Sequence, residues 1–479
     1  MNATKTALIL GAAGAALASA LVLHAAAPTS SPSARHEPAP APLAACGTPA
    51  ASHTQQKLDH GTLSGALSAG KLAQGGGGEV HASFEIATDR VADAQRPPLD
   101  LAVVIDRSGS MDGDRLDHAK SAARGIVDKL GEQDHVALIQ YDDQAQVVIG
   151  SLAMDASGKQ TIDHALDAMV TGGSTNLEAG LELGRKEVER VYKSGEASRL
   201  ILLSDGRANV GIVDPKQIAS TARDAANHGV RVTAVGLGLD FNEDLMEGIA
   251  EAGRGNYHYV KEASDLDKVI AGELASVQAT VATNVELHLV PPCAGAQIAV
   301  VHGYESRKDA TGIVVPMSDL FGGDDRKILV SLRVPDGMTG AIGAVNAELV
   351  YRDTKDGTSH TTPLALGVEI TNDNAAAIAS VDQDVMAQAM KVEAAESMRE
   401  AAQAYDRGDQ AGAAQILTTA SHHIETKGAM YKIAPAKTAA PIADLDAMKK
   451  DTVDLKPGSY QAQDMVKATK AKARAMAKH

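Results

Sequence analysis

The stretch "LAVVIDRSGSMDGDRL", residues 101–116, runs from an apolar segment into an aspartate and then two serines at alternate positions. A continuous apolar run is typical of a strand buried on both faces, as in a parallel sheet covered by helices. Ligands of such sheets gather where the strands end, at their carboxyl edge. We therefore expect Asp106, Ser108 and Ser110 to face one site at that edge, as oxygen ligands of a hard cation such as Mg²⁺.

The same pattern of short apolar runs extends over residues 98–278. Further apolar runs, such as "HVALIQY", "RLILLS" and "VRVTAVGLG", alternate with segments whose apolar residues recur at helical spacing. This alternation predicts an α/β fold with a doubly wound, mostly parallel sheet. Three oxygens cannot complete an octahedral site, and two later loops offer more donors: "TGGSTNL" (171–177) contains Thr175, and "RLILLSDGRANVG" (199–211) contains Asp205.

The set Asp106, Ser108, Ser110, Thr175 and Asp205, in that order and at those strand ends, resembles the metal-ion-dependent adhesion site of von Willebrand factor type A domains. The resemblance implies that the first aspartate, both serines and the threonine surround one divalent ion, Mg²⁺, Mn²⁺ or Ca²⁺, directly or through water. It implies that the later aspartate acts through water. An acidic side chain of a protein partner commonly takes the remaining position in this family. We therefore expect a metal-dependent adhesion or complex-assembly protein.

Strand-like alternation flanks this region on both sides. Within residues 79–97 and 279–372, apolar side chains occupy alternate positions of several short segments, which favours a β-sandwich into which the α/β domain is inserted. These segments are 80–86, 285–289, 328–334, 345–351 and 364–370. Residues 373–427 are Ala-rich with a break at "YDRGDQAG", which predicts a pair of antiparallel helices. We expect a poorly ordered basic tail over 428–479. The whole arrangement is similar to exported bacterial relatives of calcium-activated chloride channels and inter-alpha-trypsin inhibitor heavy chains.

The N-terminal segment indicates export. Residues 1–27 form an apolar run that suits an export signal or an N-terminal membrane anchor, and 28–78 are Pro-, Ala-, Ser- and Gly-rich, typical of a disordered linker. "LAAC" (43–46) leaves lipidation of Cys46 open, and Cys46 could instead pair with Cys293, the other cysteine of the chain. We expect a bacterial periplasmic or cell-surface location, with the membrane involved only through this anchor or lipid.

Charge and motifs restrict the function classes. The chain carries 45 Lys and Arg against 61 Asp and Glu, a net charge of −16, which argues against nucleic acid as a partner. No H-E-x-x-H motif occurs, and we expect no enzymatic activity. Two alternatives stay open. One is a cytoplasmic or membrane-associated assembly partner of an ATPase machine. The other is a phosphoryl-transfer hydrolase using Asp106, although Ser108 stands where such enzymes of the haloacid dehalogenase type carry a second aspartate.

Overall fold

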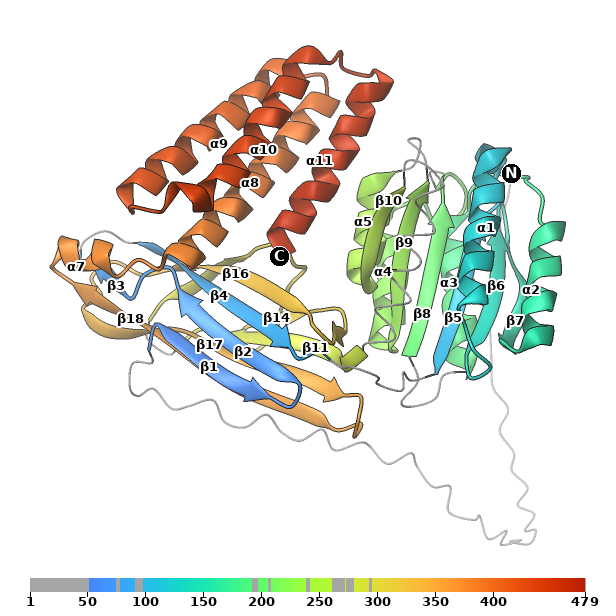
Figure 1. Ribbon diagram of the computed structural model, residues 1–479, viewed down its shortest axis with the longest axis horizontal. Helices are drawn as coiled ribbons and strands as arrows, with labels where there is room; N and C mark the ends of the chain where they lie inside the picture. The colour runs from blue at the N-terminus through green and yellow to red at the C-terminus, as the bar shows by residue number, and fades with distance from the viewer. Residues whose placement is uncertain are drawn as a thin grey trace, which may run out of the picture. The chain divides into compact units, whose positions relative to one another are not determined.

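The computed structural model describes residues 51–74, 78–90, 98–191, 197–205, 208–237, 242–260, 272, 280–292 and 295–478 (Figure 1). The predicted export segment, the first part of the predicted linker, and Cys46 and Cys293 lie outside these ranges. The described residues form a mostly parallel sheet with helices, a pair of mostly antiparallel sheets and a set of C-terminal helices.

The apolar runs of the α/β domain form one six-stranded sheet in the order β10-β9-β8-β5-β6-β7. Every pairing is parallel except that of β6 with β7. Strands β5 and β9 are buried along their whole length, and the chain is correspondingly apolar at successive positions. The strands are β5 (Leu99–Asp106), β6 (His135–Tyr141), β7 (Ala145–Ala153), β8 (Ala197–Ser204), β9 (Val230–Leu237) and β10 (Arg254–Val260).

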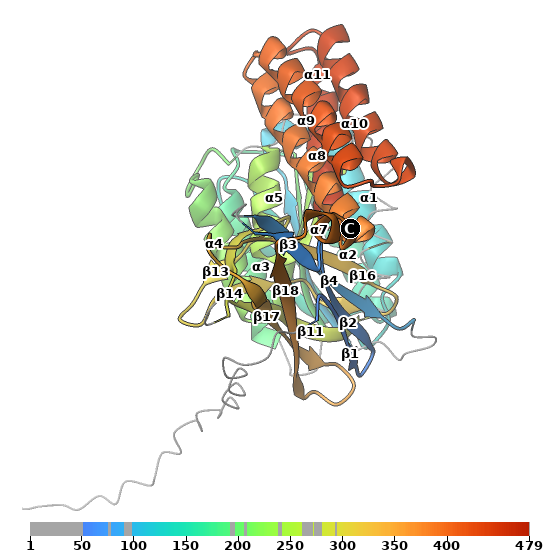
Figure 2. The ribbon, with the colours of Figure 1, turned by 90° about the vertical axis from the view of Figure 1, so that its left-hand side faces the viewer.

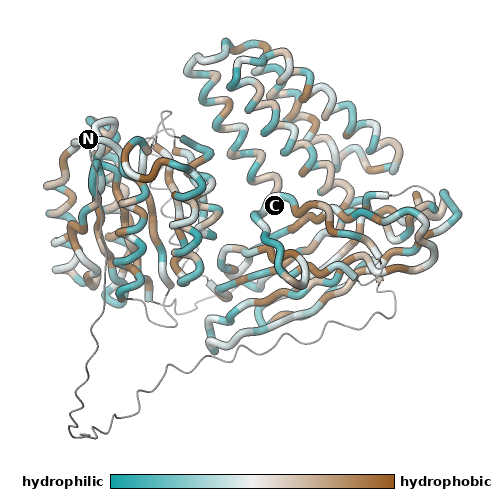
Figure 3. Tube along the Cα trace, turned by 180° about the vertical axis from the view of Figure 1, so that it is seen from behind, coloured by the Kyte–Doolittle hydropathy of each residue, from teal (hydrophilic) through white to brown (hydrophobic). Residues whose placement is uncertain are grey.

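Helices cover both faces of this sheet, as the sequence pattern predicted. Helices α1 (Asp114–Asp128) and α2 (Ala156–Ala168) pack on one face. Helices α3 (Leu177–Val191), α4 (Pro215–Asn227) and α5 (Glu243–Ala252) pack on the other. Strands of the sheet are drawn largely in brown, the hydrophobic colour, in Figure 3. The doubly wound α/β prediction is therefore confirmed.

The strands that flank the insertion form a β-sandwich with its own core. The alternating apolar residues of β4, β11, β16, β17 and β18 are buried in that core, except Ile370, which is partly buried and packs against it. One sheet has the order β1 (His53–Leu58), β2 (Gly61–Leu67), β4 (Glu79–Thr88), β16 (Asp325–Arg333) and β12 (Gln297–Val301). The other has the order β13 (Arg307–Lys308), β14 (Ile313–Pro316), β11 (Thr280–Val290), β17 (Gly340–Asp353), β18 (Ser359–Thr371) and β3 (Lys71–Ala73), and β15 (Leu320–Phe321) pairs with β11.

The predicted linker over 28–78 is wrong for residues 53–73, which form β1, β2 and β3. In β2 the buried positions are Gly61, Leu63, Gly65 and Leu67, so half of the inward side is glycine. Glycine composition suggested a tether, but the small residue is required here: a Cβ on Gly65 would lie 2.6 Å from the Leu364 side chain of the facing sheet.

The C-terminal prediction of a helix pair and a disordered tail is also wrong in part. Helices α8 (Gln383–Asp406) and α9 (Gln410–Met430) form the expected pair, with Gly408 at φ +85° in the predicted break. A short helix, α7 (Asn374–Ala379), precedes them, and α10 (Pro435–Asp454) and α11 (Tyr460–Lys478) follow. Figure 2 shows α8 to α11 side by side.

The residues expected to form a tail fold because apolar positions recur among their lysines. Ala462, Met465, Val466, Ala473 and Met476 of α11 enter the same apolar core as α8. Basic residues of α11 meet acidic residues of α5, as in the pairs of Lys470 and Lys467 with Glu243. Among the helices that the structure describes, none has the length and apolarity needed to span a bilayer.

Asp382 joins the first strand of the sandwich to the first long helix. Its carboxylate caps α8 by accepting from the amides of Asp384 and Val385, and it accepts from His53 of β1 at 2.6 Å. Burial would raise the pKa of Asp382, but these hydrogen bonds hold it below its ordinary value. We expect Asp382→Ala to lower the free energy of unfolding by about 1 kcal/mol, measured by urea denaturation. An unchanged midpoint would contradict this role of the cap.

Candidate functional site

Three loops meet at the carboxyl edge of the parallel sheet. Strand β5 ends at Asp106, and its parallel neighbour β8 ends at Ser204, directly before Asp205. The third loop, residues 170–176, leads into α3. Strands β8 and β5 are neighbours in the sheet, which brings the first two loops together at one edge. The third loop follows α2 and is joined to the first by the Gly172 amide, which donates to the Arg107 carbonyl at 2.8 Å.

Asp106 is fully buried and held by several donors. Its Oδ1 accepts from the Ser108 amide at 2.9 Å, and its Oδ2 accepts from the hydroxyls of Ser204 at 2.8 Å and Tyr141 at 3.2 Å. Burial raises the pKa of Asp106; the Ser108 and Ser204 hydrogen bonds oppose the rise, and the nearby Asp205 carboxylate adds to it. The carboxylate is thus fixed in position and lacks a full countercharge.

The two serines and Asp205 form a continuous set of contacts. The Oγ atoms of Ser108 and Ser110 lie 3.1 Å apart, and Ser110 Oγ donates to Asp205 Oδ1 at 2.9 Å. Arg115 of α1 pairs with Asp205 Oδ2 and donates to the Ser110 carbonyl at 3.1 Å. The structure therefore brings four of the five predicted residues, Asp106, Ser108, Ser110 and Asp205, into one network.

Thr175 reaches this network through its main chain. The Gly109 amide donates to the Gly173 carbonyl at 3.1 Å, which joins the first loop to the Thr175 loop. The Thr175 amide donates to Asn209 Oδ1 at 2.8 Å, and its carbonyl accepts from the Asn209 amide at 3.0 Å, which joins it to the segment after Asp205. Thr175 is buried. Main-chain hydrogen bonds thus hold the Thr175 loop next to the loops that carry the other four residues.

Glycine at position 173 allows this close approach. Gly173 has φ +68°, and a Cβ there would lie 2.8 Å from Asp143 Oδ2 and 2.9 Å from the Asp142 Cβ. A larger residue would push the Thr175 loop away from the loop after β6. Gly173 of "TGGSTNL" is therefore needed for the position of this loop.

The donor set fits a hard divalent cation. Two carboxylates without solvent exposure, Asp106 and Asp205, lie among hydroxyl oxygens, and Arg115, whose side chain is 37% exposed, is paired with Asp205. Burying two carboxylates against one partly exposed guanidinium leaves net negative charge, which is costly unless a further cation neutralises it. Carboxylate and hydroxyl oxygens are the ligands that Mg²⁺ and Ca²⁺ prefer.

Reasoning from the sequence missed four residues of this network: Arg115, Tyr141, Ser204 and Asn209. Ser204 and Asn209 belong to the "RLILLSDGRANVG" stretch, and Tyr141 is the last residue of the apolar strand β6. Their positions at or after strand ends could therefore have identified these three residues from the sequence. Arg115 lies in the first turn of α1, and no sequence pattern indicates that its side chain turns back toward Asp205.

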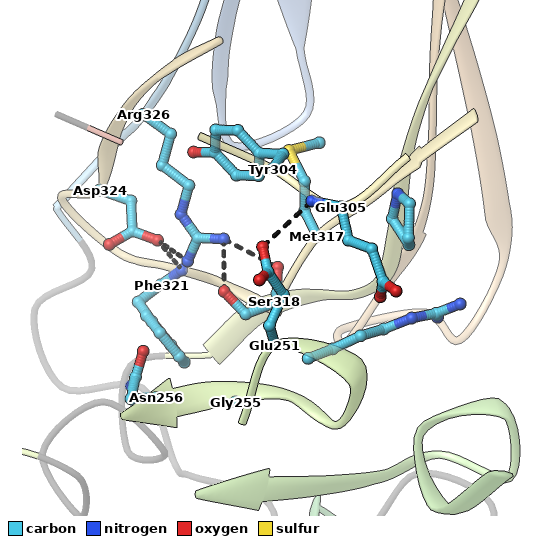
Figure 4. A pocket seen from close by; sticks show the side chains of 12 residues that line it. Glu251, Gly255, Asn256, Tyr304, Glu305, Met317, Ser318, Phe321, Asp324 and Arg326 are labelled. Atoms are coloured by element: carbon cyan, nitrogen blue, oxygen red, sulfur yellow. Dashed lines mark hydrogen bonds and ion pairs between the residues drawn. The ribbon is translucent and has the colours of Figure 1, made fainter. Parts of the chain in front are cut away.

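A separate pocket of about 230 Å³ lies between residues of α5 and β10 and residues of the sandwich (Figure 4). Charged side chains at this pocket already have hydrogen-bond partners: Arg326 donates to Ser318 and Asp324, and Glu251 accepts from the Glu305 amide at 3.1 Å. Among the described residues that line it, none belongs to the predicted metal set. This pocket therefore adds nothing to the candidate cation site.

Comparisons with known proteins place the site in a family context. A family model described as von Willebrand factor type A domain matches residues 100–272. The uncharacterized protein YfbK of Escherichia coli is 35% identical over 206 residues, which cover 43% of this chain and 35% of YfbK. Inter-alpha-trypsin inhibitor heavy chain H3 of Homo sapiens is 28% identical over 196 residues, 40% of this chain and 22% of H3.

A solved structure is similar over nearly the whole chain. The von Willebrand factor type A protein from Catenulispora acidiphila has a TM-score of 0.68 and 17% identity, covering 88% of this chain and 98% of that one. At this identity the similarity concerns the fold. The chain thus shares its architecture beyond the α/β domain, while it spans about a third or less of the lengths of YfbK and H3.

Proposed function

Residues 100–272 form a von Willebrand factor type A domain, and from this premise we propose that the chain captures an acidic side chain of a protein partner through one divalent cation. Domains of this family serve protein–protein interaction or adhesion. The observation that carries the proposal is the network of Asp106, Ser108, Ser110 and Asp205 at the carboxyl edge of the sheet.

The cation would be held by Asp106, Ser108, Ser110, Thr175 and Asp205, with Mg²⁺ as the first candidate and Mn²⁺ or Ca²⁺ as substitutes. A divalent ion with only two anionic ligands among these five residues keeps Lewis acidity for an outside carboxylate. The chain's own residues provide binding and positioning: Ser204 and Tyr141 orient Asp106, and Arg115 orients Asp205. The proposal includes no catalytic step.

We place this activity in the bacterial cell envelope, periplasmic or at the cell surface. The support is the apolar composition of residues 1–27, which suits export, together with Cys46 as a possible lipid attachment point. Protease accessibility of a tagged chain in intact spheroplasts tests this location. A fully protected chain that fractionates with the cytoplasm would instead favour the ATPase-partner alternative.

The binding proposal is tested by metal-reversible capture. The full chain, immobilised, is incubated with a native envelope extract in Mg²⁺, in excess chelator, and in chelator followed by Mg²⁺ refilling. We expect a partner retained in Mg²⁺, released by chelator and recovered on refilling, and uptake of one Mg²⁺ per chain by calorimetry. Capture that is equal in chelator, or the absence of Mg²⁺, Mn²⁺ and Ca²⁺ uptake, would contradict the proposal.

Arg115 is expected to weaken cation binding. Its guanidinium already neutralises Asp205, so an arriving cation meets reduced negative charge and like-charge repulsion. Since the Arg115 side chain is partly exposed, solvent screens this repulsion. We expect Arg115→Gln to tighten Mg²⁺ binding about three- to fivefold in calorimetric titration at low salt, with a smaller gain at high salt. Weaker binding by the variant would show that orienting Asp205 is the larger effect.

A further inference from the structure

A second cluster of metal-ligating side chains lies far from the first in sequence, at the tips of two hairpins of the β-sandwich. Asp59 and His60 form the connection between β1 and β2, Asp353 is the last residue of β17, and His360 lies near the start of β18. We propose that Asp59, Asp353 and His360 bind one transition-metal ion of the zinc type, with His60 paired to Asp353 beside it. The four residues are named here the hairpin cluster.

The donor atoms already lie close together. His360 Nδ1 is 2.9 Å from Asp59 Oδ2, and His60 Nε2 is 3.0 Å from Asp353 Oδ2. One ligand atom each of Asp59, Asp353 and His360 lies within 4.8 Å of the others. Tetrahedral ligands at about 2.0–2.1 Å from a zinc ion are about 3.3 Å apart, so shifts on the order of 1 Å would complete the site.

The hydrogen bonds around His360 leave a place for a positive charge. Asp356 can only accept, so the Thr358 hydroxyl donates to Asp356 Oδ1 at 2.8 Å. Thr358 Oγ1 then accepts from His360 Nε2, also at 2.8 Å, which assigns the ring proton to Nε2. The lone pair of Nδ1 therefore faces the Asp59 carboxylate at 2.9 Å, and two acceptors at that distance repel unless a cation lies between them.

This cation is either a metal ion or a second proton on His360, and the surroundings favour a metal site. A metal-bound histidine usually donates its other ring N–H to a neighbouring polar group, as Nε2 does to Thr358. The Tyr351 ring stacks on His360 with centroids 5.3 Å apart, and its hydroxyl donates to Asp59 Oδ2 at 3.1 Å. Both ligands are thus held in place by one aromatic side chain.

Asp353 is held in place by a hydrogen bond from the main chain. Its side chain is 5% exposed, and its Oδ1 accepts from the Lys355 amide, which leaves Oδ2 for the cluster. A buried carboxylate is stabilised by a full positive charge, and a metal shared by Asp59, Asp353 and His360 supplies one. The mixed nitrogen and oxygen donor set suits Zn²⁺ or Co²⁺ better than Mg²⁺, which prefers oxygen alone. The hairpin cluster therefore differs in metal preference from the site at Asp106.

The test is a titration of the metal-free full chain with Zn²⁺, followed by calorimetry, and with Co²⁺, followed by visible absorption. Both titrations contain millimolar Mg²⁺, which occupies the proposed site at Asp106. We expect one Zn²⁺ per chain and the absorption of tetrahedral Co²⁺. His360→Gln should weaken Zn²⁺ binding at least about 100-fold. His288→Gln is the matched control, because His288 is equally exposed on the same sheet and also paired with a carboxylate, Glu286.

Asp106→Ala should leave the Zn²⁺ titration unchanged, which separates this proposal from the proposed capture function. Circular dichroism checks that His360→Gln folds; if it does not, Asp59→Asn, at a half-exposed position, replaces it. Zn²⁺ uptake that survives both variants would overturn the assignment. The absence of uptake, with both His360 ring nitrogens protonated by NMR, would overturn it in favour of paired His–Asp ion pairs.

Discussion

Replacing Asp106 with alanine is expected to lower the affinity for Mg²⁺ by at least about 100-fold and to abolish metal-dependent partner capture. Asp106 is one of two anionic residues in the proposed site, and it is fully buried where it meets Ser108, so no neighbouring side chain can replace it. The measurements are calorimetric Mg²⁺ titration and the metal-reversible capture assay.

Two further variants make this result interpretable. Asp106→Ala also removes the acceptor of Ser204 and Tyr141, which is expected to cost about 1–3 kcal/mol of folding free energy. Asp106→Asn keeps the shape and an acceptor while removing the charge, and should lose metal binding with less effect on folding. Asp114→Ala removes an exposed acid from the first turn of α1 and should bind as wild type does. An equal loss of Mg²⁺ affinity in Asp114→Ala would contradict the assignment of the cation to the site at Asp106.

Replacing Asp319 with asparagine is expected to lower the free energy of unfolding by about 3–5 kcal/mol, because it leaves two buried arginines without their counterion. Arg231 donates to Asp319 Oδ1 at 2.9 and 2.7 Å through Nε and Nη2, and Arg199 lies 3.0 Å from Oδ2. All three side chains are less than 10% exposed, so water screens the loss poorly.

The effect of Asp319 depends on pH in a defined direction. Burial alone would raise the pKa of Asp319, but the charges of Arg231 and Arg199 outweigh it and hold the pKa below its ordinary value. An aspartate with a lowered pKa stabilises the fold above its unfolded-state pKa of about 3.9 and loses that contribution as pH falls through the folded value. The stability difference between wild type and Asp319→Asn should therefore be full at pH 7, shrink as pH falls below about 4, and vanish only below the folded-state pKa of Asp319.

Urea denaturation followed by circular dichroism at pH 7 and pH 3 measures this difference. Asp325→Asn, an exposed aspartate in β16, is the control and should change stability little at either pH. A difference between wild type and Asp319→Asn that is small at pH 7, or that grows on acidification, would contradict the role assigned to the ion pairs.

The sequence predicted the parts of this fold where periodicity and burial agree. Val285, Leu287 and Leu289 alternate with polar residues and do enter the sandwich core, and the apolar run before Asp106 is a fully buried strand. Strand ends at Asp106 and Ser204 then located the candidate site, because a parallel sheet presents its loops at one edge.

The predictions failed where side-chain identity was set by a distant neighbour. Gly65 looks like linker sequence until Leu364 of the facing sheet is in place. Lys470 looks like part of a solvated tail until it meets Glu243 of α5. Asp59 and His360 are 301 positions apart in the numbering, and only the pairing of hairpins brings them together. Local sequence patterns cannot predict contacts between residues that lie far apart in the sequence.

The position of Arg199 and Arg231 has a mechanical consequence. They are register partners near the amino ends of β8 and β9, whereas Asp205 follows the carboxyl end of β8. Tension from a partner attached at Asp205 would run lengthwise along β8 toward Asp319. A load along β8 would be shared by the hydrogen bonds that pair this strand with β5 and β9.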